Sequence, residues 1–232
     1  MGIYVLLGIV FLSALVHATL QLNLGSLLLL YHSSLGKHIK KTTRSLVGHF
    51  IAGSALLIFL GLSSACFLFA ILFGKSLPLE LLSVLVGITF SLAIIVWFTY
   101  YKIGKTTELW LPRNIARFIN SRASTTESPI EAFSLGMMIC FAELPFTFVL
   151  SLISANAIIE LPQNFEIIAL LLYVLISILP LLLLRIFIRS GKTVAEIQRW
   201  RTKNKTFLRI VSGIGFCLLG FFLFVFKILG GF

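Results

Sequence analysis

Long apolar runs separated by short polar stretches account for most of this chain. The six runs cover Leu6–Tyr31, Ser45–Phe73, Leu79–Tyr101, Ala132–Ile158, Phe165–Phe187 and Phe207–Leu229. Each is longer than the roughly 20 residues that a helix needs to cross a bilayer. Strands are excluded because the runs are too long and do not alternate. The pattern predicts an all-α integral membrane protein with six transmembrane helices in a single membrane domain, residues 1–232.

Composition agrees with this class. Hydrophobic residues make up 59% of the 232 residues, charged residues only 12%, and the mean hydropathy is +1.06. A soluble domain has about 25% charged residues, so too few polar groups are present here to cover a water-facing surface. The first run has no basic residue before it, because the first Lys or Arg is Lys37. We therefore expect a first membrane span rather than a cleaved signal peptide.

The basic residues lie almost entirely in three of the five loops and their flanks. These residues are Lys37, Lys40, Lys41 and Arg44; then Lys102, Lys105, Arg113, Arg117 and Arg122; then Arg185, Arg189, Lys192, Arg199, Arg201, Lys203, Lys205 and Arg209. Cytoplasmic loops carry an excess of Lys and Arg. The pattern predicts loops one, three and five in the cytoplasm and both termini outside, in a multi-pass protein of the plasma membrane.

The net charge of +11 is explained by these loops, so nucleic acid is not an expected partner. The sequence has no aspartate, no Walker loop, no HExxH and no GxSxG, and we expect neither an enzyme nor a cofactor. Cys66, Cys140 and Cys217 are far apart and all fall within apolar runs. They indicate packing residues rather than a disulfide framework or a metal site.

Charge topology also suggests an internal repeat. Spans one to three begin outside and spans four to six begin inside, so two homologous halves would have opposite orientations, as in many transporters. The stretch NLGSLLLL, from Asn23, matches ELPFTFVL, from Glu143, at an offset of 120 residues. We predict a 3+3 inverted repeat formed by residues 1–101 and 132–232, with a basic cytoplasmic loop at 102–131.

The fourth span contains a glutamate and a proline at mid-depth, Glu143 and Pro145. A charged carboxylate at the bilayer centre costs about 2.5–3.5 kcal/mol on insertion scales. Such a group suits proton coupling, the binding of a cationic substrate, or, as a protonated acid, the capping of a carbonyl released by the proline. Pro145 lacks the amide donor and clashes with the carbonyl of Phe141, so we expect a kink or break there.

Polar residues also cluster in the first span. His17 and Gln21 share a helix face, while Asn23 would join them only if the helix unwinds near Gly25. With Glu143 they form the predicted substrate or ion site, with helix breaks at Gly25 and Pro145. Interhelical hydrogen bonds for packing are the alternative role of these groups. Pro180 predicts a similar kink in the fifth span.

The third loop contains an amphipathic pattern in ELWLPRNIARFINSR. Its apolar residues are Leu111, Ile115, Phe118 and Ile119, and its basic residues are Arg113, Arg117 and Arg122. This arrangement is typical of a helix lying on anionic headgroups, and a plain solvated loop is the alternative. The three arginines are the predicted membrane-surface residues.

Three stretches resemble the lysine exporter superfamily of six-span transporters, including its Gap-type lipid-export branch. They are LQLNLGSLLLLYHSSLGKHIKKTTRSLVGHFIAGSALLIFLG, SPIEAFSLGMMICFAELPFTF and IQRWRTKNKTFLRIVSGIGFCLLGFFLF. The resemblance implies a 3+3 inverted repeat and export of small solutes or of envelope lipids. The first-span Pro-Gly-Pro element of the family keeps only Gly25 here. Its fourth-span Asn-Pro element keeps Pro145 and has Glu143 in place of the Asn, one residue further away, so a lysine-like substrate is not implied.

Three functions remain open at this point. A secondary transporter or exporter of a small solute or lipid would use Glu143, Asn23, Gln21 and His17. A non-transporting scaffold of an envelope-lipid machine would use the basic loops to bind a membrane protein or a second copy of the chain. An intramembrane enzyme would need His17 beside Glu143. Thiol transfer is excluded because the first span has no cysteine to match Cys140.

Overall fold

The computed structural model describes residues 2–20, 25, 27–31, 40–100, 113–189, 196, 199–200 and 203–230. All regular elements in these ranges are helices. They are α1 (Ile3–Thr19), α3 (Lys40–Phe73), α4 (Leu79–Ile95) with the π-helical turn η1 (Val96–Tyr100), α5 (Arg113–Thr125), α6 (Pro129–Ile159), α7 (Gln163–Ser177), α8 (Leu179–Arg189), and α10 (Lys205–Leu223) with the π-helical turn η2 (Phe224–Ile228). The all-α prediction is confirmed.

Four helices in the described ranges are long and apolar enough to cross a membrane. They are Thr43–Phe73, Leu79–Phe98, Pro129–Ile159 and Thr206–Ile228. The pair α7 and α8 forms a fifth if it is counted as one bent span. Helix α1 has 17 residues, about 25 Å at 1.5 Å per residue, which is less than the hydrocarbon thickness of about 30 Å. The predicted first span, Leu6–Tyr31, therefore differs from the structure, in which α1 ends at Thr19.

The start of α6 is set by its local sequence, SPIE. Ser128 is the N-cap, in an extended conformation, and Pro129 takes the first helical position. The Glu131 amide donates to Ser128 Oγ at 3.2 Å, and the Ser128 amide donates to Glu131 Oε2 at 3.4 Å. This reciprocal capping satisfies amides that have no partner inside the helix. The capping therefore fixes the residue at which α6 begins.

The two predicted proline effects have different outcomes. Helix α6 continues through Pro145 to Ile159, so the break predicted there is not seen. Proline is tolerated in membrane helices where neighbouring helices pack around it, and α6 packs against several other helices. The fifth span does bend, by 44° between Ser177 and Leu179. Pro180 cannot donate to the carbonyl of Ile176, which accounts for this bend.

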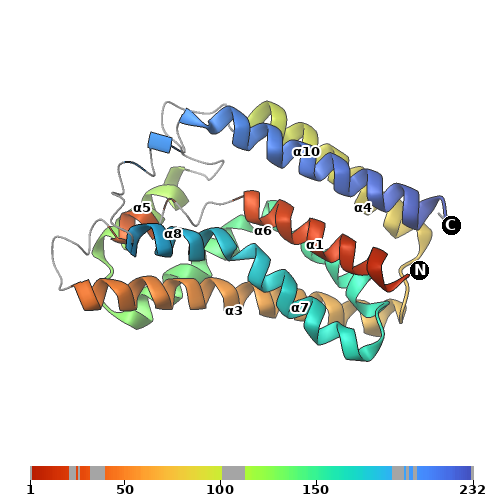
Figure 1. The fold of residues 1–232 in the computed structure, drawn as a ribbon, viewed down its shortest axis with the longest axis horizontal. Coiled ribbons are helices and arrows are strands. Elements are labelled where there is room, and N and C mark those ends of the chain that lie inside the picture. The colour runs from red at the N-terminus through yellow and green to blue at the C-terminus, as the bar shows by residue number, and fades with distance from the viewer. Residues whose placement is uncertain are drawn as a thin grey trace.

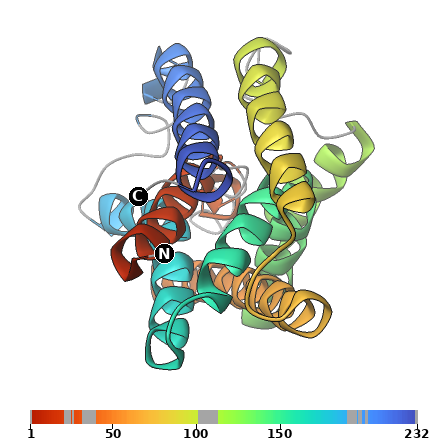
Figure 2. The same ribbon diagram turned by 90° about the vertical axis from the view of Figure 1, so that its right-hand side faces the viewer.

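Helix α6 lies at the centre of the bundle and packs against α1, α3, α4, α5 and α7. Of the most apolar 18-residue stretch of α6, 50% of the residues are buried, against 22–39% in the other three helices that can each span a membrane alone. Helix α4 packs mainly against α10 rather than against α3, to which a short turn joins it, and the two run side by side in both views (Figure 1, Figure 2). Helix α1 lies between this pair and the layer of α3, α6 and α7.

The chain ends and the turns have a definite arrangement along the bundle. The N- and C-termini lie at one end, together with the α3–α4 and α6–α7 turns (Figure 1). The start of α3, the end of α8 and α5 lie at the other end. This second end carries Arg44, Arg117, Arg122 and Arg185, all exposed, so it is the basic end of the bundle.

Helices α3 and α6 make the most extensive contact in the molecule and cross at two glycines. A Cβ on Gly53 would overlap the Phe133 carbonyl, and a Cβ on Gly136 would overlap the Phe50 carbonyl. Ser54 Oγ donates to the Gly136 carbonyl at 3.3 Å, and Cys140 Sγ lies 3.7 Å from the Ser54 carbonyl oxygen. Small residues let two membrane helices approach this closely, and Cys140 packs here as a free thiol.

The outer surface is apolar over most of the length of the helices. Large hydrophobic side chains are exposed on every long helix, among them Phe67, Ile71, Ile94, Phe141, Phe148, Leu171, Leu175, Leu218 and Phe221. Soluble monomers rarely expose contiguous apolar patches of this kind. The surface is that of a multi-pass membrane protein whose exposed side chains contact lipid.

Candidate functional site: a polar strip inside the bundle

A histidine and a tyrosine from two different helices meet inside the apolar bundle. His17, near the end of α1, is 6% exposed, and Tyr173 of α7 is fully buried. His17 Nδ1 lies 2.9 Å from the Tyr173 hydroxyl, and the two rings contact edge to face. A tyrosine hydroxyl both donates and accepts, so the pair forms with either neutral imidazole tautomer. This hydrogen bond joins residues 156 positions apart.

Serines extend this pair along the same two helices. Ser13 precedes His17 by one helical turn and Ser177 follows Tyr173 by one turn, and both are buried. The Ser13 hydroxyl has no hydrogen-bond partner among the described residues, and the Ser177 hydroxyl lies beside that of Tyr173 without the geometry of a full hydrogen bond. A buried hydroxyl without a partner is costly, so these two mark a polar spot with hydrogen-bonding capacity to spare.

Glu143 begins a second polar strip, on α6. Its side chain is 3% exposed and lies near the middle of this 31-residue helix. Thr147 Oγ1 donates to the Glu143 carbonyl at 3.2 Å, and Ser151 Oγ donates to the Thr147 carbonyl at 3.2 Å. Residues four apart lie on one helix face, so the three polar side chains share one face of α6, with the two hydroxyls bonded to backbone carbonyls of the same helix. Glu143 therefore faces the interior of the bundle and not lipid.

The two polar groups meet at the Tyr173 hydroxyl. Ser151 of α6 and Ser177 of α7 are both polar neighbours of that hydroxyl. The strip therefore runs from Glu143 through Thr147 and Ser151 to Tyr173, and from there to His17 on α1. Three helices contribute to it, and α1 packs against both α6 and α7. We call this set of five residues the polar strip.

The predicted site residues have different outcomes. His17 and Glu143 lie on neighbouring helices and both belong to the polar strip. Gln21 and Asn23 lie outside the described residues. Gly25 is helical and partly buried, and α1 ends at Thr19, six residues before it. The site as a substrate- or ion-binding site stays a prediction.

Sequence reasoning missed three members of the strip. Thr147 and Ser151 follow Glu143 by four and eight residues, so helical periodicity was a usable signal for both. Tyr173 had no such signal, because a single tyrosine in an apolar span is ordinary in membrane helices. Its role follows from the packing of α7 on α1.

The segment predicted to lie on the membrane surface contains a helix, α5, and its place at the membrane surface stays a prediction. Arg117 and Arg122 are exposed, while Ile119 is 3% exposed and Ala123 is fully buried. The backbone of Arg113 begins the helix, and its side chain lies outside the described positions. The helix has one basic, solvent-facing side and one apolar side that packs in part on α6.

No protein-family model, no curated protein and no solved structure matches this chain. The resemblance to the lysine exporter superfamily therefore stays a prediction. The functional argument has to be made from the polar strip, the arrangement of the helices and the charge distribution.

Proposed function

We propose that this protein is a secondary transporter or exporter of a small solute or of an envelope-lipid component. Its site lies at the membrane midplane between α1 and α6, the first and fourth predicted spans, and transport is proton-coupled through Glu143. The observation that carries this proposal is the buried Glu143 side chain in the middle of the central helix, joined by the polar strip to α1. Ionisable residues at such a position are mostly functional, since they are expensive to bury in a bilayer.

The packing pattern supports the proposed six spans and the inverted repeat. Exchanging α1 with α6, α3 with α7–α8, and α4 with α10 converts one half into the other. The exchange would turn the α3–α6 contact into the α7–α1 contact, and the α1–α10 contact into the α6–α4 contact, and these four are present, whereas the α6–α7 contact has no comparable α1–α3 counterpart in the described residues. In Figure 1 the two members of each exchanged pair run in opposite directions. Transporters with inverted repeats have these properties.

The proposed symmetry has a consequence for the site. The α1–α6 contact is converted into itself by the exchange, so it lies on the axis that relates the halves. Transporters with inverted repeats bind substrate and coupling ions at the repeat interface near the midplane. His17 from one half and Glu143 from the other are at this interface, and rocking of one half against the other would change access to them.

The charge distribution supports one orientation of the protein across the membrane. The basic end of the bundle would face the cytoplasm, and the end with both termini would face outside, because basic residues favour the cytoplasmic side. The plasma membrane is the proposed location. The resemblance to the lysine exporter superfamily points to the same plan, and the replacement of its Asn-Pro element by Glu143 and Pro145 supports a different coupling.

The test is Glu143→Gln in proteoliposomes. Two probes cover the proposed substrate classes: a panel of amino acids and polyamines with trapped pyranine as the pH reporter, and fluorescent phosphatidylglycerol with dithionite quenching. We expect the wild-type signal to fall at least about tenfold in Glu143→Gln, because the neutral amide can no longer gain and lose a proton. Glu80→Gln, at the exposed start of α4, is the matched control and should transport normally. Equal flux in wild type and Glu143→Gln would remove Glu143 from the mechanism.

The amphipathic helix α5 favours a second candidate function. The protein would then be a non-transporting scaffold that holds a membrane protein partner, or a second copy of itself, through its basic surface. Reversing the charge at Arg113 and Arg117 should abolish co-purification of that partner, and Glu143→Gln should leave it intact. Loss of the partner in Glu143→Gln alone would contradict the scaffold function.

A further inference from the structure

A pocket of about 390 Å³ lies between α3 and α8 at the basic end of the bundle. Helix α3 contributes Arg44, Ser45, Gly48, His49 and Ala52, and α8 contributes Arg185. A water molecule takes up about 30 Å³ in the liquid, so the pocket admits a group of the size of a lipid headgroup. It is separate from the polar strip.

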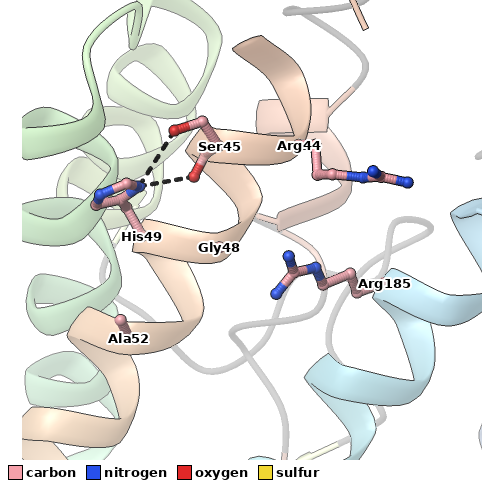
Figure 3. Close-up of a pocket in the computed structure, with 6 residues that line it drawn as sticks. All are labelled: Arg44, Ser45, Gly48, His49, Ala52 and Arg185. Carbon is pink, nitrogen blue, oxygen red and sulfur yellow. Dashed lines mark hydrogen bonds between the residues drawn. The ribbon is translucent and has the colours of Figure 1, made fainter. Parts of the chain in front are cut away.

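The charge of this pocket is positive. Arg44 extends from α3 toward the side of α8, and Arg185 extends from α8 toward Gly48 of α3 (Figure 3). No carboxylate is among the lining residues, and neither arginine has an ion-pair partner among the residues that the structure describes. Two other lining residues are bonded to each other within α3, since His49 Nδ1 donates to the Ser45 carbonyl at 2.8 Å. The two guanidinium groups point in different directions (Figure 3), and they are the positive charges that the lining offers to an anion.

Glycine at position 48 makes room for one of these groups. A Cβ on Gly48 would lie 3.7–3.9 Å from the atoms of the Arg185 guanidinium, so the side chain of Arg185 rests against the bare backbone of α3. A larger residue at position 48 would push the guanidinium out of this position. An alanine at position 48 would make ordinary contact with the Arg185 guanidinium, so the limit falls on larger side chains such as valine.

The depth of the pocket identifies the source of the anion. Arg44 is the second residue of the span Thr43–Phe73, and Arg185 is near the end of the bent span that closes at Phe187. Both arginines are therefore at the boundary between the apolar core and water, where lipid phosphates lie. Leu183 and Ile186, on either side of Arg185, are exposed and apolar, and they offer a surface for acyl chains beside the charged pocket.

We propose that this pocket binds the phosphate group of an anionic membrane phospholipid, held by the guanidinium groups of Arg44 and Arg185. Arginine suits this role because its planar group donates two parallel hydrogen bonds to phosphate oxygens. The bound lipid would bridge α3 and α8, helices that belong to different halves of the chain. The site does not depend on transport, so it stands even where Glu143→Gln transports normally.

The test is native mass spectrometry of the full chain in a neutral detergent, titrated with dioleoyl phosphatidylglycerol. Dioleoylglycerol, which has the same acyl chains without phosphate, and inorganic phosphate are the comparison ligands. We expect one retained phosphatidylglycerol, and a loss of affinity of about tenfold in each of Arg44→Gln and Arg185→Gln, as for a charge-assisted hydrogen bond. Gly48→Val should weaken binding without any change of charge.

Matched variants keep the result interpretable. Arg199→Gln removes one exposed positive charge outside the pocket and should retain the lipid. Arg185→Lys keeps the charge and should bind better than Arg185→Gln, which separates loss of the site from misfolding. Phosphatidylglycerol retention that is unchanged in the double variant Arg44→Gln/Arg185→Gln, or matched by dioleoylglycerol, would overturn the proposal. Arginine-dependent binding of inorganic phosphate without lipid binding would overturn the lipid source and assign the pocket to a soluble phosphate compound.

Discussion

The lysine inside the last predicted span, Lys227, has its charge balanced by one glutamate. Lys227, in η2, forms an ion pair with Glu160 at the end of α6, and their side chains are only 6% and 18% exposed. The pair ties the last helix to the central one at the end of the bundle where both chain termini lie. Breaking a buried pair strands the remaining charge in a poorly solvated place, whereas surface pairs contribute little.

This ion pair leads to a prediction about stability. Lys227→Met should lower the free energy of unfolding by about 2 kcal/mol, between the values for surface and fully buried pairs. The measurement is denaturant unfolding in detergent. The double variant Lys227→Met/Glu160→Gln should recover most of the loss, because no charge is then left unpaired. Lys75→Met, in the exposed turn after α3, is the control, and an equal loss there would show that the ion pair adds nothing.

At the scale of the helices, the α3–α6 crossing is the contact that positions α6. Its two glycines, Gly53 and Gly136, each lie against a backbone carbonyl of the other helix. Gly61, further along α3, has open space where a Cβ would be. The same substitution should therefore have opposite effects at different glycines.

We expect Gly136→Ala to destabilise the protein by at least about 1–3 kcal/mol, because a Cβ there overlaps backbone that cannot move aside. Gly61→Ala should instead stabilise it by about 0.5–1 kcal/mol, since alanine favours the helix and meets no neighbour. Thermal unfolding in detergent measures both. Two shifts of the same sign would contradict the close approach of α3 and α6.

The arrangement of the whole molecule predicts which segments share a side of the membrane. The turn with Lys75 lies at the end of the bundle with both termini, and Arg199 belongs to a basic loop, on the opposite side in the proposed topology. In a cysteine-free background, Lys75→Cys should react with a membrane-impermeant maleimide in intact cells, and Arg199→Cys should react only after permeabilisation. Labelling of both from the same side would contradict the proposed number of spans.

Much of the architecture could be predicted from the sequence. The boundaries of α3, α4, α6 and the α10–η2 helix agree with the apolar runs to within a few residues, since only long apolar helices satisfy their backbone groups in lipid. The bend in the fifth span follows from Pro180, whose missing amide is a local property. Pro145 has the same chemistry in α6 without a break, because α6 is held on several sides by the helices packed around it.

The candidate site divides in the same way. A carboxyl group in an apolar run stands out in the sequence because it is costly to bury. Glu143 was therefore identifiable from the sequence alone, as was its position near the middle of its helix. The pairing of His17 with Tyr173 was not identifiable, because the two residues are 156 positions apart and nothing local in either helix indicates the other. The pocket between Arg44 and Arg185 depends likewise on α8 packing against Gly48.

Hydropathy and charge along the chain determined which segments are helices, where they are apolar and which ends are basic, since these properties belong to each residue and its near neighbours. Only the tertiary structure decided which polar groups meet inside the bundle, because side-chain contacts between helices are set by how those helices pack.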